Sequence, residues 1–154
     1  MIFTHDYLVA LGAKWLSKTV KCGFVVTELK AYTESGEVPD CIGFKGNGFS
    51  VLVECKTSRP DFTADKKKLF RQQPELGMGL YRFYLCPEGL LLPDELPDRW
   101  GLLYATKTGC VEQIICPKGN TWGCHPTNCF IEHNKNDEWN LMYSALRRIQ
   151  RTLD

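Results

Sequence analysis

The run Val51-Leu52-Val53-Glu54-Cys55-Lys56 decides how this chain folds. Its apolar side chains do not alternate with polar ones, which is typical of a strand buried on both faces of a sheet. We therefore expect a strand over residues 49–57. Two earlier strands are expected over residues 24–32, which are rich in β-branched and aromatic side chains, and over residues 38–44. Short glycine-containing turns between them predict an antiparallel meander.

The segments after this meander predict a sheet that is partly parallel. Residues 60–73 are expected to form a helix, and residues 80–86 a strand that follows it. Because a helical crossover allows neighbouring strands to run in the same direction, strand 80–86 is expected to run parallel to strand 49–57. A hairpin is expected from residues 102–106 and 111–116.

Helices are expected at both ends of the chain. Residues 6–20 and residues 137–153 carry apolar side chains near helical spacing. The side chains of the last helix that are expected to face inward are Trp139, Met142, Leu146, Ile149 and Leu153. Together these elements predict a single α/β domain over residues 1–154, with a mixed sheet flanked by helices and with residues 117–136 as an ordered loop or insertion.

The bulk composition limits the class of protein. The 154 residues suffice for one domain with a real core. The net charge of +1 excludes a polycation, so any nucleic-acid site must be a local concentration of positive charge. The sequence shows no signal-peptide pattern and no apolar run of about 18 residues that could span a membrane. We therefore expect a cytoplasmic protein whose eight cysteines are reduced.

Two acids and a lysine lie at the ends of neighbouring predicted strands. Asp40 follows Pro39 in the second strand, and Glu54 and Lys56 close the third. Carboxylates are the hard oxygen ligands that Mg²⁺ prefers, and the backbone carbonyl of Cys55 could add another. Lys56 shares a strand face with Glu54, because residues two apart point to the same side. A metal that acidifies water, beside a lysine that offsets negative charge, suits hydrolysis of a phosphodiester.

A structural ion pair explains part of the same pattern. A glutamate in an apolar strand is costly unless it is paired or liganded, and a contact between Glu54 and Lys56 would offset that cost without any catalysis. Both interpretations require Glu54 and Lys56 to share a face. Only the metal site also requires Asp40 to meet them.

At these residues the chain resembles the PD-(D/E)XK nuclease superfamily, whose members have the restriction-endonuclease-like fold. The matching residues are Pro39, Asp40, Glu54 and Lys56. The stretch VLVECKTSRPDFTADKKKLF, residues 51–70, further resembles a phage and bacterial branch that is similar to DNA-repair and resolvase-like nucleases. The resemblance implies a Mg²⁺-dependent endonuclease, with Mn²⁺ as an alternative metal. In it Asp40 and Glu54 would bind the metal and Lys56 would assist the attacking water.

The resemblance also singles out an acid upstream of the PD strand. Many members of the superfamily complete the metal shell with such a residue, and Glu28 lies in the preceding predicted strand. The resemblance thus implies that Glu28 is a further metal ligand. A surface acid paired with Lys30 on the same strand face is the competing interpretation.

A local excess of positive charge follows the ExK motif. Residues 56–71 hold six lysines and arginines against two aspartates, an excess of four charges. Such a strip beside a metal site would attract the phosphates of a DNA backbone, and it would position the duplex without reading its sequence. Candidate phosphate contacts are Arg59, Lys66 and Lys67. A solvated helix face is the alternative interpretation.

The cysteines near the end of the chain are the candidates for structural zinc. They are Cys116, Cys124 and Cys129, with His133 as a fourth ligand. Zinc requires four such ligands in a tetrahedron, but a C-x-x-C knuckle is missing and the spacing is irregular. The pattern therefore favours unlinked thiols over a zinc site.

Two functions from different classes follow. The first is Mg²⁺-dependent hydrolysis of DNA phosphodiester bonds by a phage or DNA-repair type of nuclease. The second is a non-catalytic module of the same fold that binds nucleic acid or a host protein, with a surface that Trp122, Phe130 and Trp139 could supply. Whether the chain forms a homodimer stays open at this level.

Overall fold

The computed structural model describes residues 2–115 and 129–154. Six strands make one sheet in the order β1 to β6 along the chain. The strands are β1 (Phe24–Thr27), β2 (Cys41–Phe44), β3 (Ser50–Cys55), β4 (Tyr81–Pro87), β5 (Trp100–Ala105) and β6 (Val111–Ile115). The helices are α1 (His5–Lys18), α2 (Arg59–Lys66), α3 (Leu69–Gln72) and α4 (Lys135–Leu153), with the 3-10 turns η1 (Pro74–Leu76) and η2 (Pro93–Glu95).

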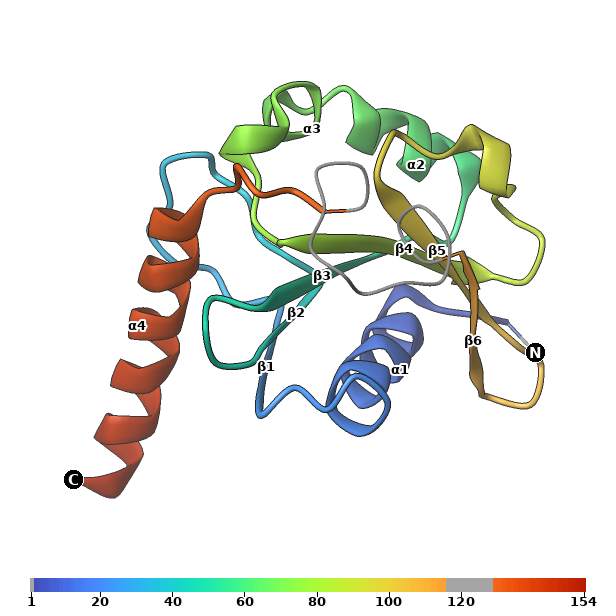
Figure 1. Ribbon diagram of the computed structural model, residues 1–154. Helices are drawn as coiled ribbons and strands as arrows, with labels where there is room; N and C mark the ends of the chain where they lie inside the picture. Colours follow the sequence, from blue (N-terminus) through green and yellow to red (C-terminus); the bar gives the residue numbers. More distant parts are fainter. Residues whose placement is uncertain (1, 116–128) are drawn as a thin grey trace.

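The sheet is mixed. β1, β2 and β3 form the predicted antiparallel meander, and β4 runs parallel to β3 after the crossover through α2, α3 and η1. β5 continues parallel to β4, and β6 closes the predicted hairpin against β5. Figure 1 shows α1 on one face of this sheet and α2 and α3 on the other. The prediction of a single α/β domain with a mixed, helix-flanked sheet is confirmed.

The strand β3 is buried along its whole length and divides the core into two layers. Val51, Val53 and Cys55 pack with α1, whereas Leu52 belongs to the apolar cluster on the opposite face. Strand side chains alternate between the faces, so Glu54 points to the side of Leu52, away from α1. The prediction of a strand that is covered on both faces is therefore confirmed. Glu54 lies on the face of the sheet that α2 and α3 cover.

Two predicted elements are longer than the observed ones. The strand expected over residues 24–32 ends at Thr27, because Glu28 has a positive φ of 46° and its N–H donates to the carbonyls of Pro39 and Asp40. The helix expected over residues 60–73 is divided into α2 and α3. The break lies at Lys68, whose backbone is extended, with φ −64° and ψ 143°.

The prediction for the inward face of the last helix is wrong. Leu141 and Ala145 are buried, whereas Trp139 and most of the apolar stripe around it face solvent. Buried acids in the first turn set this orientation. Asp137 accepts hydrogen bonds from Ser35, and Glu138 accepts them from Ser50 Oγ and the N–H of Gly79. Polar contacts, rather than the wider apolar face, thus fix α4 to the body.

The expected loop or insertion over 117–136 lies partly outside the described residues, which resume at Cys129. The chain runs from there to the N-cap of α4 at Asn134. Cys129 and Phe130 are buried, so Phe130 does not contribute to an exposed surface, and Trp122 lies outside the described residues. Two of the zinc candidates, Cys116 and Cys124, also lie outside them.

In residues 2–115 and 129–154 no helix is both long enough and apolar enough to cross a membrane.

Candidate functional site

The meander brings Asp40 and Glu54 together. Asp40 directly precedes β2, and the antiparallel register pairs its neighbour Cys41 with Val53 on β3. One carboxylate oxygen of Asp40 accepts a hydrogen bond of 2.7 Å from the N–H of Cys55, and the N–H of Asp40 donates to Glu54 Oε1 over 3.4 Å. These reciprocal contacts hold the two acids beside each other at one edge of the sheet.

Lys56 joins the two acids on the same side of β3. Its Nζ lies 3.8 Å from Glu54 Oε2 and 3.5 Å from Asp65 Oδ1, and its side chain is nearly buried. All four residues line an open hollow of about 290 Å³. We call it the Asp40–Glu54 hollow; the residues that line it are His5, Val38, Asp40, Glu54, Cys55, Lys56, Asp61, Ala64, Asp65 and Lys68.

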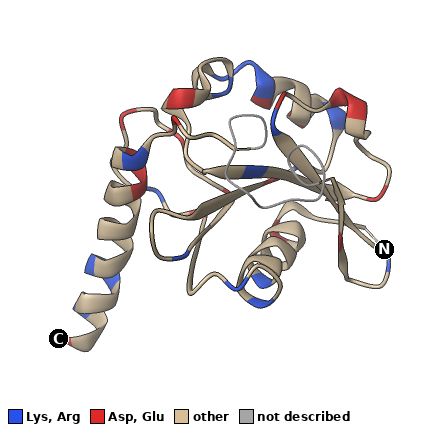
Figure 2. Ribbon diagram, in the orientation of Figure 1, with Lys and Arg blue, Asp and Glu red and all other residues tan. Residues whose placement is uncertain are grey.

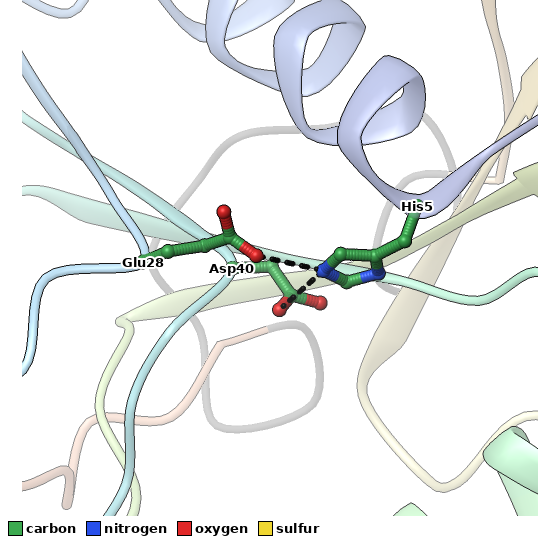
Figure 3. A group of neighbouring side chains, drawn as sticks. All are labelled: His5, Glu28 and Asp40. Atoms are coloured by element: carbon green, nitrogen blue, oxygen red, sulfur yellow. Dashed lines mark hydrogen bonds and ion pairs between the residues drawn. The ribbon is translucent and has the colours of Figure 1, made fainter.

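Glu28 approaches Asp40 from the end of β1, together with a histidine from α1. His5 Nε2 lies 2.9 Å from Glu28 Oε1 and 3.5 Å from Asp40 Oδ1 (Figure 3). One ligand atom from each of the three residues lies within 4.8 Å of the others. The left-handed backbone of Glu28 is uncommon for a residue with a side chain, and such conformations cluster at functional sites. No sequence pattern predicted His5 as a site residue, because it is the first residue of α1 and belongs to no motif.

Cys55 contributes its backbone rather than its sulfur. Its N–H orients Asp40, while its side chain is buried in the layer under α1. A hydrogen bond with Cys41 and burial raise the pKa of the Cys55 thiol well above its usual value. The sulfur is therefore neither a thiolate nor directed toward the hollow.

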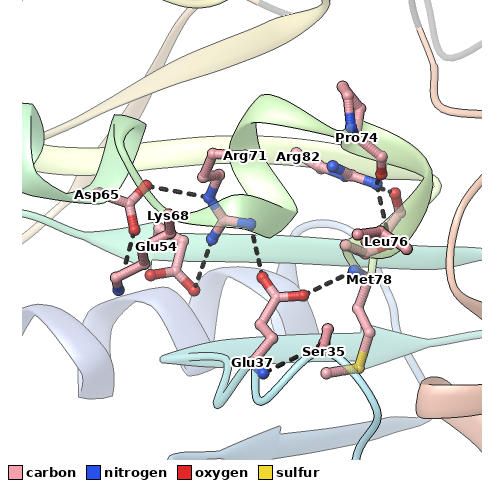
Figure 4. Close-up of polar contacts among 12 residues, drawn as sticks. Ser35, Glu37, Glu54, Asp65, Lys68, Arg71, Pro74, Leu76, Met78 and Arg82 are labelled. Atoms are coloured by element: carbon pink, nitrogen blue, oxygen red, sulfur yellow. Dashed lines mark hydrogen bonds and ion pairs between the residues drawn. The ribbon is translucent and has the colours of Figure 1, made fainter.

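Arg71 closes the inner side of the hollow with a set of buried ion pairs (Figure 4). Its guanidinium lies 2.6 Å from Glu37 Oε2, 3.0 Å from Asp65 Oδ2 and 3.5 Å from Glu54 Oε1. Asp65 also accepts a 2.7 Å hydrogen bond from the hydroxyl of Tyr84. The division of the predicted helix into α2 and α3 carries Asp65 and Arg71 to this common centre.

The surroundings shift the pKa values of Glu54 and Asp65 in opposite directions. Burial raises the pKa of Glu54 to about 8, with Asp40 adding to the shift and Arg71 and Lys56 opposing it. For Asp65 burial acts in the same direction, but the charges of Arg71 and Lys56 outweigh it and lower the pKa to about 2. Asp65 is thus a fixed anion, whereas Glu54 needs more positive charge than its protein neighbours provide.

The residues of the hollow fit a divalent cation. Four carboxyl groups line it, from Asp40, Glu54, Asp61 and Asp65, against the ammonium groups of Lys56 and Lys68, so with Glu54 ionised four negative minus two positive charges leave an excess of two. Adding Arg71 and its partner Glu37 leaves this balance unchanged. Asp65 Oδ1 is buried and has no hydrogen-bond partner among the described residues. Lys56 and Lys68 contact this oxygen only as ion pairs, at 3.5 and 3.3 Å, so the excess negative charge is what a bound cation would satisfy.

The predicted phosphate contacts lie outside the hollow. Arg59 is paired with Glu95 and donates to the carbonyl of Leu90. Lys66 lies over the ring of Phe62, and Lys67 is exposed at the end of α2. Figure 2 shows acidic and basic residues interleaved over α2 and α3 rather than an unbroken basic strip.

One basic residue does reach the hollow. Lys68 lines it, with Nζ 3.3 Å from Asp65 Oδ1 and the side chain half exposed. Lys68 belongs to the predicted run of positive charge, but three consecutive lysines look alike in a sequence, so nothing there distinguishes it from Lys66 and Lys67.

Comparison with known proteins supports the fold of this chain but gives no information on its activity. No protein-family model matches the chain, and no curated protein matches it. A solved structure, that of a protein of unknown function from Silicibacter pomeroyi, superimposes with a TM-score of 0.62 and 24% sequence identity, over all of this chain and 94% of that one. The α/β architecture described above thus also occurs in an experimentally determined structure.

Proposed function

We propose that this protein is a metal-dependent nuclease that hydrolyses DNA phosphodiester bonds, with the Asp40–Glu54 hollow as its active site. The observation that carries the proposal is the convergence of Asp40, Glu54 and Lys56 on one open, negatively charged hollow. The crossover from β3 to a parallel β4 and the restriction-endonuclease-like resemblance support it. Fold alone does not determine activity, so the argument depends on this site.

The chain's own residues have distinct tasks in this proposal. Asp40, Glu54 and Glu28 offer oxygen ligands for Mg²⁺ or Mn²⁺, and His5 offers a nitrogen. Bound there, the cation would acidify a water and neutralise phosphate charge. Lys56 is held by Glu54 and Asp65 and lines the hollow, so its ammonium would offset the charge of a phosphate bound there. Arg71 fixes the acids from behind.

The direct experiment compares substrates and metals. Supercoiled plasmid, linear duplex DNA, single-stranded DNA and RNA would each be incubated with the protein in Mg²⁺, in Mn²⁺ and in chelator. The proposal expects metal-dependent cleavage of DNA and none in chelator. Absence of cleavage under every metal condition, or equal cleavage in chelator, would contradict it.

Lys56→Met is expected to slow DNA cleavage by about 10²–10³-fold, the usual cost of removing one donor that stabilises transition-state charge. Methionine preserves the length of the buried side chain and removes only its charge. The measurement is the single-turnover rate at saturating DNA, with DNA binding measured separately. Lys67→Met serves as the control, because Lys67 is an exposed lysine at the end of α2 and does not line the hollow. Equal losses of binding and rate in Lys56→Met would instead indicate a phosphate clamp.

His5→Ala is expected to weaken Mn²⁺ binding by about tenfold and Mg²⁺ binding by less, because imidazole is a better ligand for softer metals. The variant keeps Glu28, the hydrogen-bond partner of His5, and Asp40, 3.5 Å from it, so their oxygens can still bind Mg²⁺. Calorimetric titration of the purified protein with each metal measures both constants. An identical loss for the two metals would show that His5 orients the acids and does not touch the ion.

One observation favours the non-catalytic alternative. Lys56 and Arg71 already pair with Glu54 and Asp65, so the cluster is partly neutralised by its own side chains. A module that only binds nucleic acid or a host protein would keep such pairs as structure. The same metal titration discriminates: this alternative expects no saturable Mg²⁺ or Mn²⁺ binding that depends on Asp40.

A further inference from the structure

The helix α4 carries an apolar stripe that the described residues 2–115 and 129–154 leave largely uncovered. The stripe consists of residues that follow one another at intervals of three, four, three and four: Trp139, Met142, Leu146, Ile149 and Leu153. Four of these side chains are largely exposed, with Trp139 at 69%, Leu146 at 60%, Ile149 at 46% and Leu153 at 75%. Large apolar side chains gathered in this way mark an interaction surface.

The contacts of α4 with the body use a different side of the helix. Leu141 and Ala145 pack into the core, and Asp137 and Glu138 are held by hydrogen bonds to neighbouring loops. Beyond Ala145 every residue of α4 is exposed. Figure 1 shows this half of α4 projecting away from the sheet toward the C-terminus. Of the stripe only Met142 packs against the core, so Trp139, Leu146, Ile149 and Leu153 contribute little to holding the domain together.

The spacing of the stripe identifies the shape of its partner. Apolar residues that alternate at three and four positions form a seam that stays in register with one facing α-helix. In this heptad numbering Trp139, Leu146 and Leu153 occupy the first core position, and Met142 and Ile149 occupy the second. A membrane surface has no comparable requirement for a narrow seam.

The residues that border the seam fit a second copy of this same chain. The exposed residues on its two sides are Tyr143, Gln150 and Thr152, none of which is charged, while Ala145 on one side packs against the body. Two identical seams can therefore meet without opposing like charges, which are what usually forbids self-pairing at these positions. The three arginines of the helix, Arg147, Arg148 and Arg151, lie off the seam.

We propose that α4 is a homodimerisation helix, whose 139–153 seam packs against the same seam of a second copy. Such a contact is isologous, so it closes as a two-fold dimer and leaves no free seam. The seam is only about two heptads long, so the expected dimer is weak, with a dissociation constant in about the micromolar range.

Sedimentation equilibrium of the full chain tests the proposal, over protein concentrations of about 1 to 200 µM. The wild type is expected to show a monomer–dimer equilibrium. Leu146→Glu is expected to weaken dimerisation by about 30-fold or more, because it introduces two charges into one seam. The matched control is Arg147→Glu, which changes the adjacent, off-seam position and should keep the dissociation constant within about threefold. Circular dichroism of each variant verifies that α4 is still helical.

Three results would overturn the proposal. The first is a wild-type chain that is monomeric at every concentration, and the second is a Leu146→Glu variant that dimerises as tightly as the wild type. The third is a monomeric wild type that binds vesicles of phosphatidylcholine and phosphatidylglycerol through Leu146, which would make α4 a membrane-surface helix. All measurements omit metal and DNA, so they are independent of the proposed nuclease activity.

Discussion

Glu54→Gln is expected to abolish metal-dependent cleavage and, in the same protein, to stabilise the metal-free fold above pH 8. The loss of cleavage should be about 10³-fold or more, because a neutral amide cannot replace the carboxylate that neutralises and holds the cation. The gain in stability has a different cause. Glu54 is buried among Asp40 and Asp65, and its pKa of about 8 shows that its charged form is unfavourable without a cation.

The direction of the pH dependence follows from linkage. The pKa of Glu54 rises from 4.5 to about 8 on folding, so the folded state holds a proton that the unfolded state has released between these values. The free energy of unfolding of the wild type therefore falls as the pH rises from 4.5 to about 8, by a few kcal/mol for a shift of this size. Glutamine has no proton to lose, so the variant should lack this decline. Asp65 titrates far below this window.

Denaturant unfolding in chelator, at several pH values from 5 to about 9, measures the difference between wild type and variant. Glu112→Gln is the control, because Glu112 is an exposed carboxylate on β6 and its replacement should leave the pH profile unchanged. Saturating Mg²⁺ should restore the stability of the wild type at high pH and have no such effect on Glu54→Gln. Parallel pH profiles for wild type and Glu54→Gln would show that Glu54 is already fully compensated by Arg71.

The sequence predicted those parts of the fold that depend on local chemistry. The unbroken apolar run 51–55 identified a doubly covered strand, and the helical crossover predicted that β4 is parallel to β3. The same local reasoning failed for α4, since the stripe from Trp139 to Leu153 is wider and more regular than the pair Leu141 and Ala145 that packs inward. Buried Asp137 and Glu138 decide the orientation of α4, and their partners are up to 103 residues away in the chain.

The candidate site was predictable where its residues lie on neighbouring strands. Asp40, Glu54 and Lys56 follow from strand periodicity and one short turn. His5, Glu37 and Arg71 reach the site from three separate segments, so no spacing in the sequence reveals them. Asp65 lies within the quoted 51–70 stretch, but only the structure shows that it faces Lys56 and Arg71. Arg59 looked free in the sequence because its partner Glu95 is distant.

Arg71→Met is expected to destabilise the protein by about 3–5 kcal/mol, the usual cost of removing one partner from a buried ion pair. Arg71 is almost completely buried between Glu37, Glu54 and Asp65, and their charges raise its pKa despite the opposing effect of burial. Methionine fills a similar volume but removes the cation that Glu37 pairs with, and it leaves Glu54 and Asp65 with only their lysine partners. Thermal unfolding should detect a fall in Tm of about 10 °C for a chain of this size.

The matched control is Lys68→Met, since Lys68 also pairs with Asp65 but is half exposed. Exposed pairs contribute about 0–1 kcal/mol, so Lys68→Met should change Tm by only a few degrees. The defect of Arg71→Met should also shrink at low pH, because the uncompensated carboxylates can then take up protons, and it should shrink when Glu37→Gln is added. If the Tm of Arg71→Met fell no further than that of Lys68→Met, the three acids would have to be neutralised by something other than Arg71, and the buried cluster would not be the electrostatic support of the Asp40–Glu54 hollow.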